Sequence, residues 1–294
     1  MIILAGPTAA GKTALAIQLA ERYGAAIISA DSRQCYRAMK IGVARPSEEE
    51  LQRVPHHFIA EYALHEPINA AYFEQMALQT CQQLHSKNPV VVMTGGTGLY
   101  IKAFMEGLDA MPAIPGDIRT ELQAEYEEKG LDWLQAEVRK ADPTFWEQAE
   151  QQNPRRLQRA LEVLRTTGHS ILHYRKAAQA QRPFEIIPFF LQLPAPLLRD
   201  RIDQRVDAMI AAGWVEEVRS LLPYRTFPAL QTVGYRELMQ YLDGAFSLEE
   251  AIRKIKINTW QYARRQMTWT KKQSGFTSVA GDKDPLGSML QMLG

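Results

Sequence analysis

Residues 6–13 of this chain, Gly-Pro-Thr-Ala-Ala-Gly-Lys-Thr, match the pattern G-x-x-x-x-G-K-[ST] of a phosphate-binding loop at every fixed position. Such a loop must connect a buried strand to a helix. Residues 1–5 are apolar and partly β-branched, which predicts the strand, and residues 14–23 are good helix formers followed by a glycine, which predicts the helix. The motif therefore has its required context of strand, loop and helix.

The composition of this loop explains how it would bind an anion. Its glycines let the backbone bend so that successive N–H groups point at one phosphate, and the following helix adds its free N–H groups and its dipole. Lys12 would bridge terminal phosphate oxygens, and the Thr13 hydroxyl would hold Mg²⁺. The phosphate-binding residues predicted in this way are Gly6, Pro7, Thr8, Ala9, Ala10, Gly11, Lys12 and Thr13.

Length and composition restrict the class of protein. The chain has 294 residues, 46% hydrophobic and 23% charged, so it can bury a large core, and we expect more than one domain. The net charge of +1 gives no global attraction to nucleic acid, so any such attraction must come from local clusters. Two cysteines, Cys35 and Cys81, form neither a disulfide framework nor a zinc pattern. With no signal peptide and no apolar run of membrane-spanning length, we expect a cytoplasmic protein without a membrane partner.

Strands and helices alternate in the first third of the chain. Buried strands are predicted at residues 25–30 and 89–94, and helices at residues 71–85 and 99–105. This order predicts an α/β fold of the phosphate-loop NTPase type, with a parallel sheet and helices on its faces. Ligands of such sheets bind beyond the carboxyl ends of the strands. The phosphate loop, the turn that starts at Asp31 and the Gly-Gly-Thr-Gly segment at residues 95–98 should therefore converge there.

A helical insertion is predicted from about Pro112 onward. One helix should begin at Gly116 and stop near Gly130, and the pairs Asp142-Pro143 and Asn153-Pro154 have the residue types that start helices. Residues 117–150 hold ten acidic and four basic residues, whereas residues 155–176 hold six basic residues and one acidic residue. We expect an insertion domain at residues 113–183 and a core domain made of residues 1–112 with 184–294.

The remainder is predicted to return to the sheet and then to be helical. Residues 184–193 form a strand pattern in which Pro188 indicates an edge strand or a bulge. Helices are predicted at residues 196–212, 215–222, 235–242 and from a capping box at Ser247 and Glu250 to about residue 272. The tail after Ser274 is expected to be loosely held.

Two features narrow the chemistry. The strand at residues 90–94 ends in Gly-Gly-Thr-Gly and not in an Asp that could help to hold Mg²⁺, which disfavours a nucleotide-hydrolysing motor or switch. The acid at a strand end in this half is Asp31, which could act as a general base facing the phosphate site. It could equally be a cap of a polar turn. In the same turn, Gln34 could bind an adenine edge and Tyr36 could stack on a base.

The last long helix is rich in basic residues. No acid interrupts the sequence from residue 253 to residue 272, and Trp260, Tyr262 and Trp269 lie among the cations. Basic residues with aromatics are typical of nucleic-acid binding, although a solvated helix whose aromatics pack on the core has the same pattern, and we prefer that interpretation for most of the aromatics. The cations of this helix are Arg253, Lys254, Lys256, Arg264, Arg265, Lys271 and Lys272.

Taken together, these segments resemble the tRNA dimethylallyltransferase (isopentenyl-tRNA transferase) family over almost the whole chain, to about Lys272. The motifs that carry the resemblance are the phosphate loop, residues 31–37 with Ile41, Gly42 and Pro46, Val54 to His57, Gly95 to Tyr100, residues 153–162, 201–206, 231–236 and 263–269. The loop has Ala10 where relatives often have Ser, which removes no backbone donor.

The resemblance implies a reaction. The family transfers a prenyl group from dimethylallyl diphosphate, with Mg²⁺, to the exocyclic N6 of the adenosine immediately 3′ of the anticodon, in tRNAs that read codons beginning with U. By motif position the catalytic residues would be Asp31, Thr97, Lys12 and Arg205, with Asp31 as general base, Lys12, Thr97 and Arg205 as diphosphate contacts, and Thr13 as the metal ligand. The implied tRNA-binding residues are Asp31, Ser32, Arg33, Gln34, Thr97, Arg119, Arg155, Arg156, Leu157, Gln158 and Arg159.

The resemblance also gives the insertion a purpose, because in this family the insertion grips the anticodon stem-loop. A monomer is expected. Two other classes remain open on the residues alone. A small-molecule or nucleoside kinase could use the same loop for ATP, but it needs neither the helical insertion nor an acid-free basic helix. A tRNA-binding protein without activity would not need Lys12, Thr13 and Asp31 together.

Overall fold

The computed structural model of the chain describes residues 1–175 and 180–294 and divides them into two compact units. The first unit consists of Met1–Met105 and Gln181–Gly294, and the second of Glu106–Ala180. Of the insertion expected at residues 113–183, residues 176–179 lie outside the described part of the chain.

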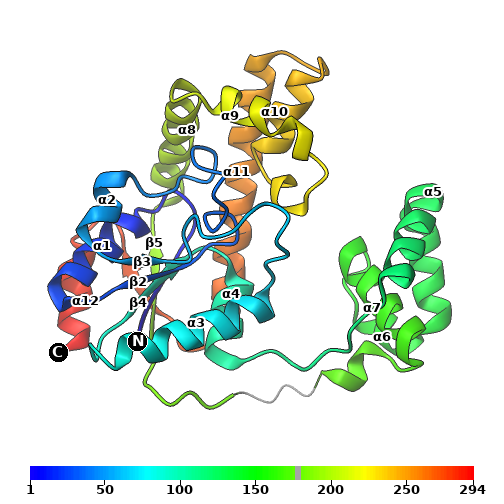
Figure 1. Ribbon diagram of the computed structural model, residues 1–294, viewed down its shortest axis with the longest axis horizontal. Coiled ribbons are helices and arrows are strands. Elements are labelled where there is room, and N and C mark those ends of the chain that lie inside the picture. Colours follow the sequence, from blue (N-terminus) through cyan, green and yellow to red (C-terminus); the bar gives the residue numbers. More distant parts are fainter. Residues whose placement is uncertain (176–179) are drawn as a thin grey trace. The chain divides into compact units, whose positions relative to one another are not determined.

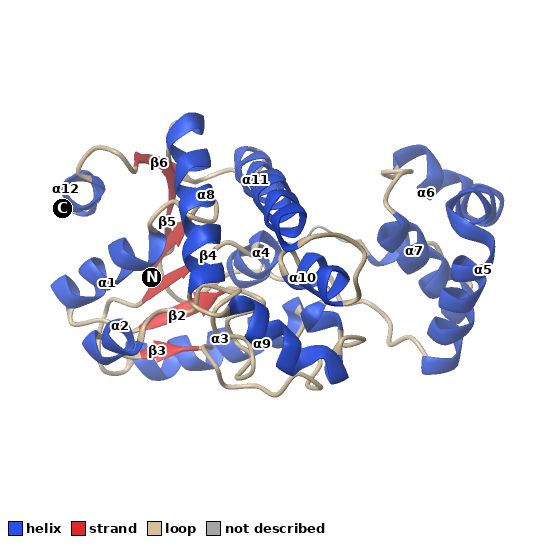
Figure 2. Ribbon diagram, turned by 90° about the horizontal axis from the view of Figure 1, so that it is seen from above, coloured by secondary structure: helices blue, strands red, loops and turns tan. Residues whose placement is uncertain are grey.

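The first unit is built on a sheet of six parallel strands, which confirms the predicted α/β class (Figures 1 and 2). The spatial order of the strands is β3-β2-β4-β1-β5-β6, so the strand before the phosphate loop lies inside the sheet. The strands are β1 (Ile2–Ala5), β2 (Ile27–Ala30), β3 (His56–His57), β4 (Val92–Gly95), β5 (Ile187–Gln192) and β6 (Thr277–Ala280).

Both faces of the sheet are covered by helices. Ile2 and Leu4 of β1 belong to one hydrophobic core and Ile3 and Ala5 to the other, because successive side chains of a strand point to opposite faces. The first of these cores contains side chains of α1 (Lys12–Tyr23), α8 (Ala195–Ala211) and α12 (Pro285–Leu293). The second contains side chains of α3 (Ala70–His85), α4 (Gly98–Glu106), α9 (Trp214–Leu221) and α10 (Tyr235–Leu242). Burial on both faces explains the continuous apolar runs in these strands.

Strand β5 differs from the expectation of an edge strand. It pairs with β1 on one side and with β6 on the other, so it is an inner strand. Pro188 is tolerated because β6 begins to pair only at Phe189, opposite Thr277. The N–H of Ile187 donates to β1 through Met1 O, so the missing N–H of Pro188 falls on the other side of the strand, before β6 begins.

The tail after Ser274 is not loosely held, contrary to the sequence expectation. Residues 277–280 form β6, and α12 packs against α1, with Met289 fully buried between the helix and its neighbours. Figure 1 shows α12 beside α1 at the same side of the sheet. Of the Gly, Ser and Asp residues that suggested a loose tail, Ser278 lies in β6, Gly287 and Ser288 lie in α12, and Asp284 caps α12.

The predicted helices of the first unit are present, with two short elements, α2 (Glu48–Arg53) and β3, that the sequence did not indicate. Asn69 caps α3, since its Oδ1 accepts from the N–H of Tyr72 at 3.0 Å. Helix α11 (Leu248–Lys271) begins after Ser247, whose hydroxyl accepts from the N–H of Glu250 at 3.2 Å. Only this half of the expected capping box forms, because the Glu250 carboxylate pairs with Arg253 and Lys254. Two 3₁₀ turns, η2 (Leu222–Tyr224) and η3 (Pro228–Leu230), connect α9 to α10.

The second unit has its own hydrophobic core. It consists of α5 (Gly116–Ala141), α6 (Pro143–Gln148), α7 (Pro154–Thr167) and the 3₁₀ turn η1 (Ile171–Tyr174). Gly130, with φ of 75°, interrupts α5 where a helix stop was expected. Asp142 and Asn153 cap α6 and α7 as predicted, by accepting from the N–H groups of Phe145 and Arg156. Across the described parts of both units, no helix combines the length and apolarity that crossing a membrane requires.

Candidate active site

Three loops meet at the carboxyl ends of β1, β2 and β4, as the sequence indicated. The phosphate loop, the turn at Asp31 and the segment that begins at Gly95 line one polar pocket of about 80 Å³. A second pocket of about 210 Å³ adjoins it and shares Thr8, Asp31 and Arg205 as lining residues. The polar pocket therefore opens directly beside a larger chamber.

The phosphate loop has the backbone that anion binding requires. Gly11 lies just before α1 with φ of 95°, and Ala9 also has a positive φ, of 63°. The ammonium group of Lys12 donates to the carbonyl oxygen of Pro7 at 2.7 Å, so it is folded back over the loop. Burial of this group and the nearby charge of Arg205 lower the pKa of Lys12 to about 7.

Helix α8 contributes a second cation to the loop. Arg205 donates to the Thr8 hydroxyl at 3.3 Å, and Arg201 donates to the carbonyl oxygen of Ala10 at 3.3 Å. Burial lowers the pKa of Arg205, and the carboxylate of Asp31 acts in the opposite direction. Lys12 and Arg205, two half-buried cations beside the N–H groups of the phosphate loop, form a site for a multiply charged anion. Arg205 was expected here, whereas Arg201 was not singled out from the sequence.

Asp31 has features of both roles that the sequence left open. Its Oδ1 atom accepts from the N–H groups of Arg33 at 2.8 Å and Gln34 at 3.2 Å, which makes it a turn cap. Its side chain is half-buried and lines the polar pocket together with Lys12 and Arg205. Because capping uses only Oδ1, Asp31 Oδ2 remains to accept a proton or hydrogen bond; among the described residues, none donates to it.

The other residues of the Asp31 turn are held by protein partners. The Thr97 hydroxyl accepts from the N–H of Ser32 at 3.0 Å, so it links the segment after β4 to the turn after β2. The amide of Gln34 donates to the carbonyl oxygens of Val43 and Ala44 at 3.2 and 3.0 Å. In this arrangement Gln34 fixes the loop at residues 43–44, and its amide N–H groups are used within the protein.

Gln266 of α11 is a site residue that the sequence reasoning did not identify. Its Oε1 accepts from the N–H of Thr8 at 2.8 Å, and its Nε2 donates to the carbonyl oxygen of Gly96 at 2.9 Å. A Cβ at Gly96 would lie 2.1 Å from the Gln266 amide nitrogen, so a side chain there would displace Gln266 from its hydrogen bonds. The signal available from the sequence was its place within the motif at residues 263–269.

The larger pocket has an apolar end. Val206 and Met209 of α8, Trp214 of α9, Val43 and Val233 line it. Asp31, Arg205, Thr232 and Thr259 are among its polar lining residues. Tyr262 of α11 lines both pockets, and its burial and the nearby Asp31 carboxylate raise the pKa of its hydroxyl. The combination suits a ligand with an anionic head and a short apolar body.

The aromatic residues of α11 mainly pack, as preferred from the sequence. Trp269 packs on Gly98, where a Cβ would lie 2.4 Å from the ring, and Trp260 packs against the core under α1. Several cations of α11 are compensated, since Arg253 and Lys254 pair with Glu250 and Lys256 pairs with Asp207. Four others are exposed and are absent from the ion pairs found in the described parts of the chain: Arg264, Arg265, Lys271 and Lys272.

The basic residues of the second unit lie on α5 and α7. The guanidinium groups of Arg119 and Arg159 both lie close to Glu162, at 3.7 and 3.1 Å. Arg156 pairs with Glu150 at 3.1 Å, and Arg155 is exposed. The side chain of Gln158 donates to Gln123 at 3.0 Å, and that of Leu157 is fully buried in the unit's core. The exposed Arg155 and Arg156 thus lie on α7, which packs in the unit's core through Leu157.

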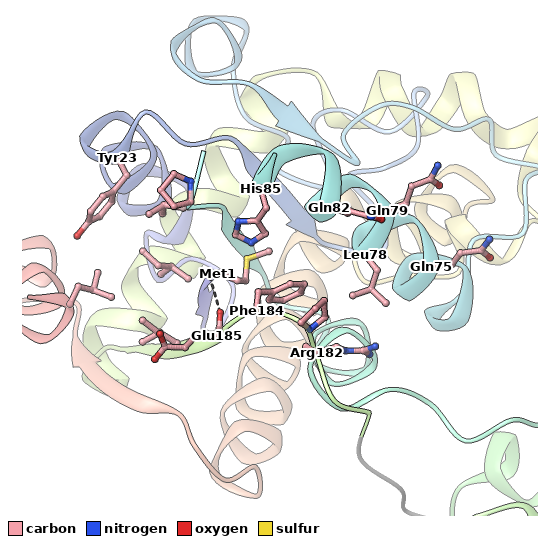
Figure 3. A pocket seen from close by; sticks show the side chains of 16 residues that line it. Met1, Tyr23, Gln75, Leu78, Gln79, Gln82, His85, Arg182, Phe184 and Glu185 are labelled. Carbon is pink, nitrogen blue, oxygen red and sulfur yellow. Dashed lines mark hydrogen bonds between the residues drawn. The ribbon is translucent and has the colours of Figure 1, made fainter. Parts of the chain in front are cut away.

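A separate cavity of about 1040 Å³ lies at the opposite end of the strands (Figure 3). It is lined by Met1, His85, Phe184 and Glu185 among others, and the Met1 ammonium donates to the carbonyl oxygen of Glu185 at 2.9 Å. Met1 and Ile187 are at the amino ends of β1 and β5, whereas the phosphate loop is at the carboxyl end of β1. Its size alone does not make it the active site, because it lacks the phosphate loop and Asp31.

Known proteins resemble this chain over most of its length. Residues 34–273 match the family model described as IPP transferase. The chain is 43% identical to the tRNA dimethylallyltransferase of Cytophaga hutchinsonii over 93% of this chain and 90% of that protein. The chain belongs to this family. The family expected from the motifs is therefore confirmed.

Solved structures show the same relationship. The tRNA isopentenylpyrophosphate transferase of Bacillus halodurans is 33% identical with a TM-score of 0.72, and 99% of this chain and 93% of that chain are covered. The corresponding transferase of Staphylococcus epidermidis is 28% identical with a TM-score of 0.71, at 99% and 96% coverage. The IPP transferase fold thus extends over both units of the chain.

Proposed function

We propose that the chain transfers a dimethylallyl group from dimethylallyl diphosphate to the exocyclic N6 of an adenosine in tRNA, with release of diphosphate. The observation that carries the proposal is that Asp31 and Arg205 line a pocket with Lys12 and also line an adjoining pocket of about 210 Å³, to which apolar side chains such as those of Val206, Met209 and Trp214 contribute. An anion-binding end, a proton acceptor and a short apolar space are the three requirements of this transfer. Membership of the family indicates tRNA as the acceptor and dimethylallyl diphosphate as the donor.

The phosphate loop would bind the diphosphate of the donor. When the C–O bond of the donor breaks, negative charge grows on the leaving oxygen, and nearby cations stabilise it. Lys12 and Arg205 are placed at the loop for this role. The pKa of Lys12, about 7 in the free protein, would rise when an anion binds, so binding would secure the protonated form.

Asp31 would accept the proton of the adenosine amine. The amine nitrogen forms its bond to the allylic carbon as the carbon–oxygen bond to diphosphate breaks, and the N–H proton moves to Asp31 Oδ2. The turn that Oδ1 caps holds the carboxylate in one orientation while the other oxygen faces the reaction. Thr97 supports this turn through Ser32, and we propose that it also contacts the diphosphate.

Magnesium fits this site as an ion shared with the diphosphate. No cluster of three or more His, Cys, Asp or Glu side chains that could hold a metal occurs over residues 1–175 and 180–294, so a cage made only of protein ligands is not available there. Mg²⁺ is commonly held by few protein ligands together with substrate phosphates and water. Thr13, at the start of α1, would be its protein ligand. Bound in this way the ion would neutralise charge on the leaving group.

The tRNA would contact basic residues of both units. We propose that the second unit, with Arg119 and the segment from Arg155 to Arg159, holds the anticodon stem-loop, and that the turn from Asp31 to Gln34 contacts the adenosine. The target base must leave its stack to reach Asp31, as in other enzymes that modify a base. The proposed target is the adenosine immediately 3′ of the anticodon in tRNAs that read codons beginning with U.

We also propose the compartment and the oligomeric state of the protein. Cys35 and Cys81 are buried free thiols, and cysteines that form no disulfide suit a reducing compartment such as the cytoplasm. A monomer remains our prediction, which light scattering of the purified protein would test.

The decisive experiment is mass analysis of nucleosides. Unmodified tRNA is incubated with the protein, Mg²⁺ and dimethylallyl diphosphate, and the digest is examined for adenosine that has gained one five-carbon group. A tRNA in which the adenosine next to the anticodon is replaced by guanosine is the matched control. If ATP is hydrolysed and no prenylated nucleoside forms, the phosphate-loop kinase alternative replaces the proposal.

A further inference from the structure

A carboxylate on α9 binds a loop next to the candidate active site. Glu217 Oε2 accepts from the backbone N–H groups of Lys40 at 3.0 Å and Ile41 at 2.7 Å, and Oε1 accepts from that of Gly42 at 3.1 Å. The hydroxyl of the fully buried Tyr235 donates to Oε1 at 2.6 Å. Three consecutive N–H groups around one carboxylate form an anion nest whose anion is part of the protein.

The indole ring of Trp214, on the same helix, packs against this loop. Trp214 is almost fully buried, and its indole lies between two glycines. A Cβ at Gly42 would lie 2.0 Å from Trp214 Nε1, and a Cβ at Gly234 would lie 2.1 Å from the far edge of the ring. The backbone of the loop can therefore approach the indole only because residue 42 has no side chain.

The loop held in this way is a wall of the larger pocket. Gly42, Val43 and Ala44 line that pocket, and so does Trp214. From the Asp31 turn, Gln34 donates to the carbonyl oxygens of Val43 and Ala44. Glu217 thus fixes the N–H groups at residues 40–42, and Gln34 fixes the carbonyl groups immediately after them. Because residues 40–42 and residues 43–44 are both held by hydrogen bonds, the distance between this loop and Trp214 is fixed as well.

We propose that Glu217 is a positioning residue that sets the size of the larger pocket and thereby selects a five-carbon allylic diphosphate over a longer one. The inference rests on the proposed function, since it assigns the donor's carbon chain to this pocket. Glu217 does not itself line the pocket; it acts through residues 40–44 and the ring of Trp214. One methylene more or less in such a pocket changes the discrimination between two substrates by about 10- to 200-fold. A loop at residues 40–44 that can move away from Trp214 should therefore lower the selectivity between donors measurably.

The test compares Glu217→Gln with Glu74→Gln. The variant Glu217→Gln keeps the shape of the side chain, but one of its two oxygens becomes a donor that faces N–H groups. Glu74 is the matched control, because its carboxylate pairs with Arg182 at 2.7 Å in the same unit and lines neither active-site pocket. Steady-state transfer to tRNA is measured with dimethylallyl diphosphate and with the ten-carbon geranyl diphosphate.

For Glu217→Gln we expect the KM for dimethylallyl diphosphate to rise about tenfold and the relative kcat/KM for the ten-carbon donor to rise about tenfold, the lower end of one-methylene discrimination. The KM for tRNA should not change, and amide exchange at residues 40–42 should accelerate. Glu74→Gln should lower thermal stability without changing either donor parameter. Donor KM and selectivity equal to those of the parent would overturn the inference. No transfer by the parent from either donor would instead refute the proposed function.

If Glu217→Gln does not fold, Tyr235→Phe decides the question, because it removes only the bond from the hydroxyl to Oε1. A rise of about threefold in the KM for the five-carbon donor is expected there, smaller than the tenfold expected when the carboxylate itself is altered, since the variant removes one of the four hydrogen bonds that the carboxylate accepts. An unchanged donor KM in Tyr235→Phe would count against the inference in that case.

Discussion

Replacing Asp31 by Asn separates its two roles. The Oδ1 atom accepts from two N–H groups, and the amide oxygen of Asn can accept the same bonds, so the turn should remain. The proton acceptor, in contrast, is lost. General-base catalysis contributes about 10²- to 10⁴-fold, which corresponds to a barrier increase of about 2.7 to 5.4 kcal/mol. We expect a rate loss in this range with both substrates still bound.

The assay is single-turnover transfer with saturating tRNA and donor, together with a thermal melt. The matched control is Asp284→Asn, because Asp284 caps α12 by accepting from the N–H of Gly287 at 3.0 Å and lies outside both active-site pockets. Both variants should lose less than about 1 kcal/mol of stability, and only Asp31→Asn should lose rate. A rate within about threefold of the parent, well below the loss of a general base, would remove Asp31 from the mechanism.

Further predictions concern the phosphate loop, the tRNA contacts and Gln266. Lys12→Ala should lower the transfer rate by about a hundredfold or more, with tRNA affinity unchanged, and an equal rate would exclude Lys12 from leaving-group stabilisation. The pKa of Lys12 is about 7, and the anion binds the protonated form. Affinity for inorganic diphosphate should therefore fall by up to about tenfold per pH unit as pH rises above 7. Calorimetry should show that the part of this pH dependence that comes from Lys12 is absent in Lys12→Ala. Replacing Arg155, Arg156 and Arg159 by Ala should flatten the slope of log tRNA affinity against log salt by about 0.7 to 0.9 for each lost contact, and binding like the parent would contradict it. Gln266→Ala should leave the N–H of Thr8 and the carbonyl of Gly96 unpaired, at about 1–3 kcal/mol each, and a melting temperature equal to that of the parent would show that the link is dispensable.

Several features of the site could be predicted from the sequence because they depend on neighbours in the chain. The strand, loop and helix around residues 6–13 follow from glycine spacing and apolar runs. The position of Asp31 follows from its place directly after a buried strand of a parallel sheet. The helix starts at Asn69, Asp142 and Asn153 follow from local capping chemistry. Each of these depends on interactions within a few residues.

Other features could not be predicted because they join segments that are distant in the chain. Gln266 links two loops that precede it by 258 and 170 residues, and nothing in its immediate sequence indicates those partners. The nest of Glu217 depends on residues 40–42, about 175 positions earlier. Strand β6 was missed because only Val279 of its four residues is buried, which leaves a weak pattern, and its pairing with β5 made Pro188 a residue of an inner strand.

The sequence by itself thus determined the phosphate-binding turn, the parallel α/β class and the carboxylate at the end of β2, since local spacing and burial are sufficient for these. Tertiary structure decided the rest of the site. It alone placed Arg201 at the carbonyl oxygen of Ala10, 191 residues away, and showed that Asp31 caps its turn with Oδ1 while Oδ2 accepts from no described residue. The physical reason is that hydrogen bonds and apolar walls of a pocket form between side chains whose distances are set by the packing of the sheet and its helices.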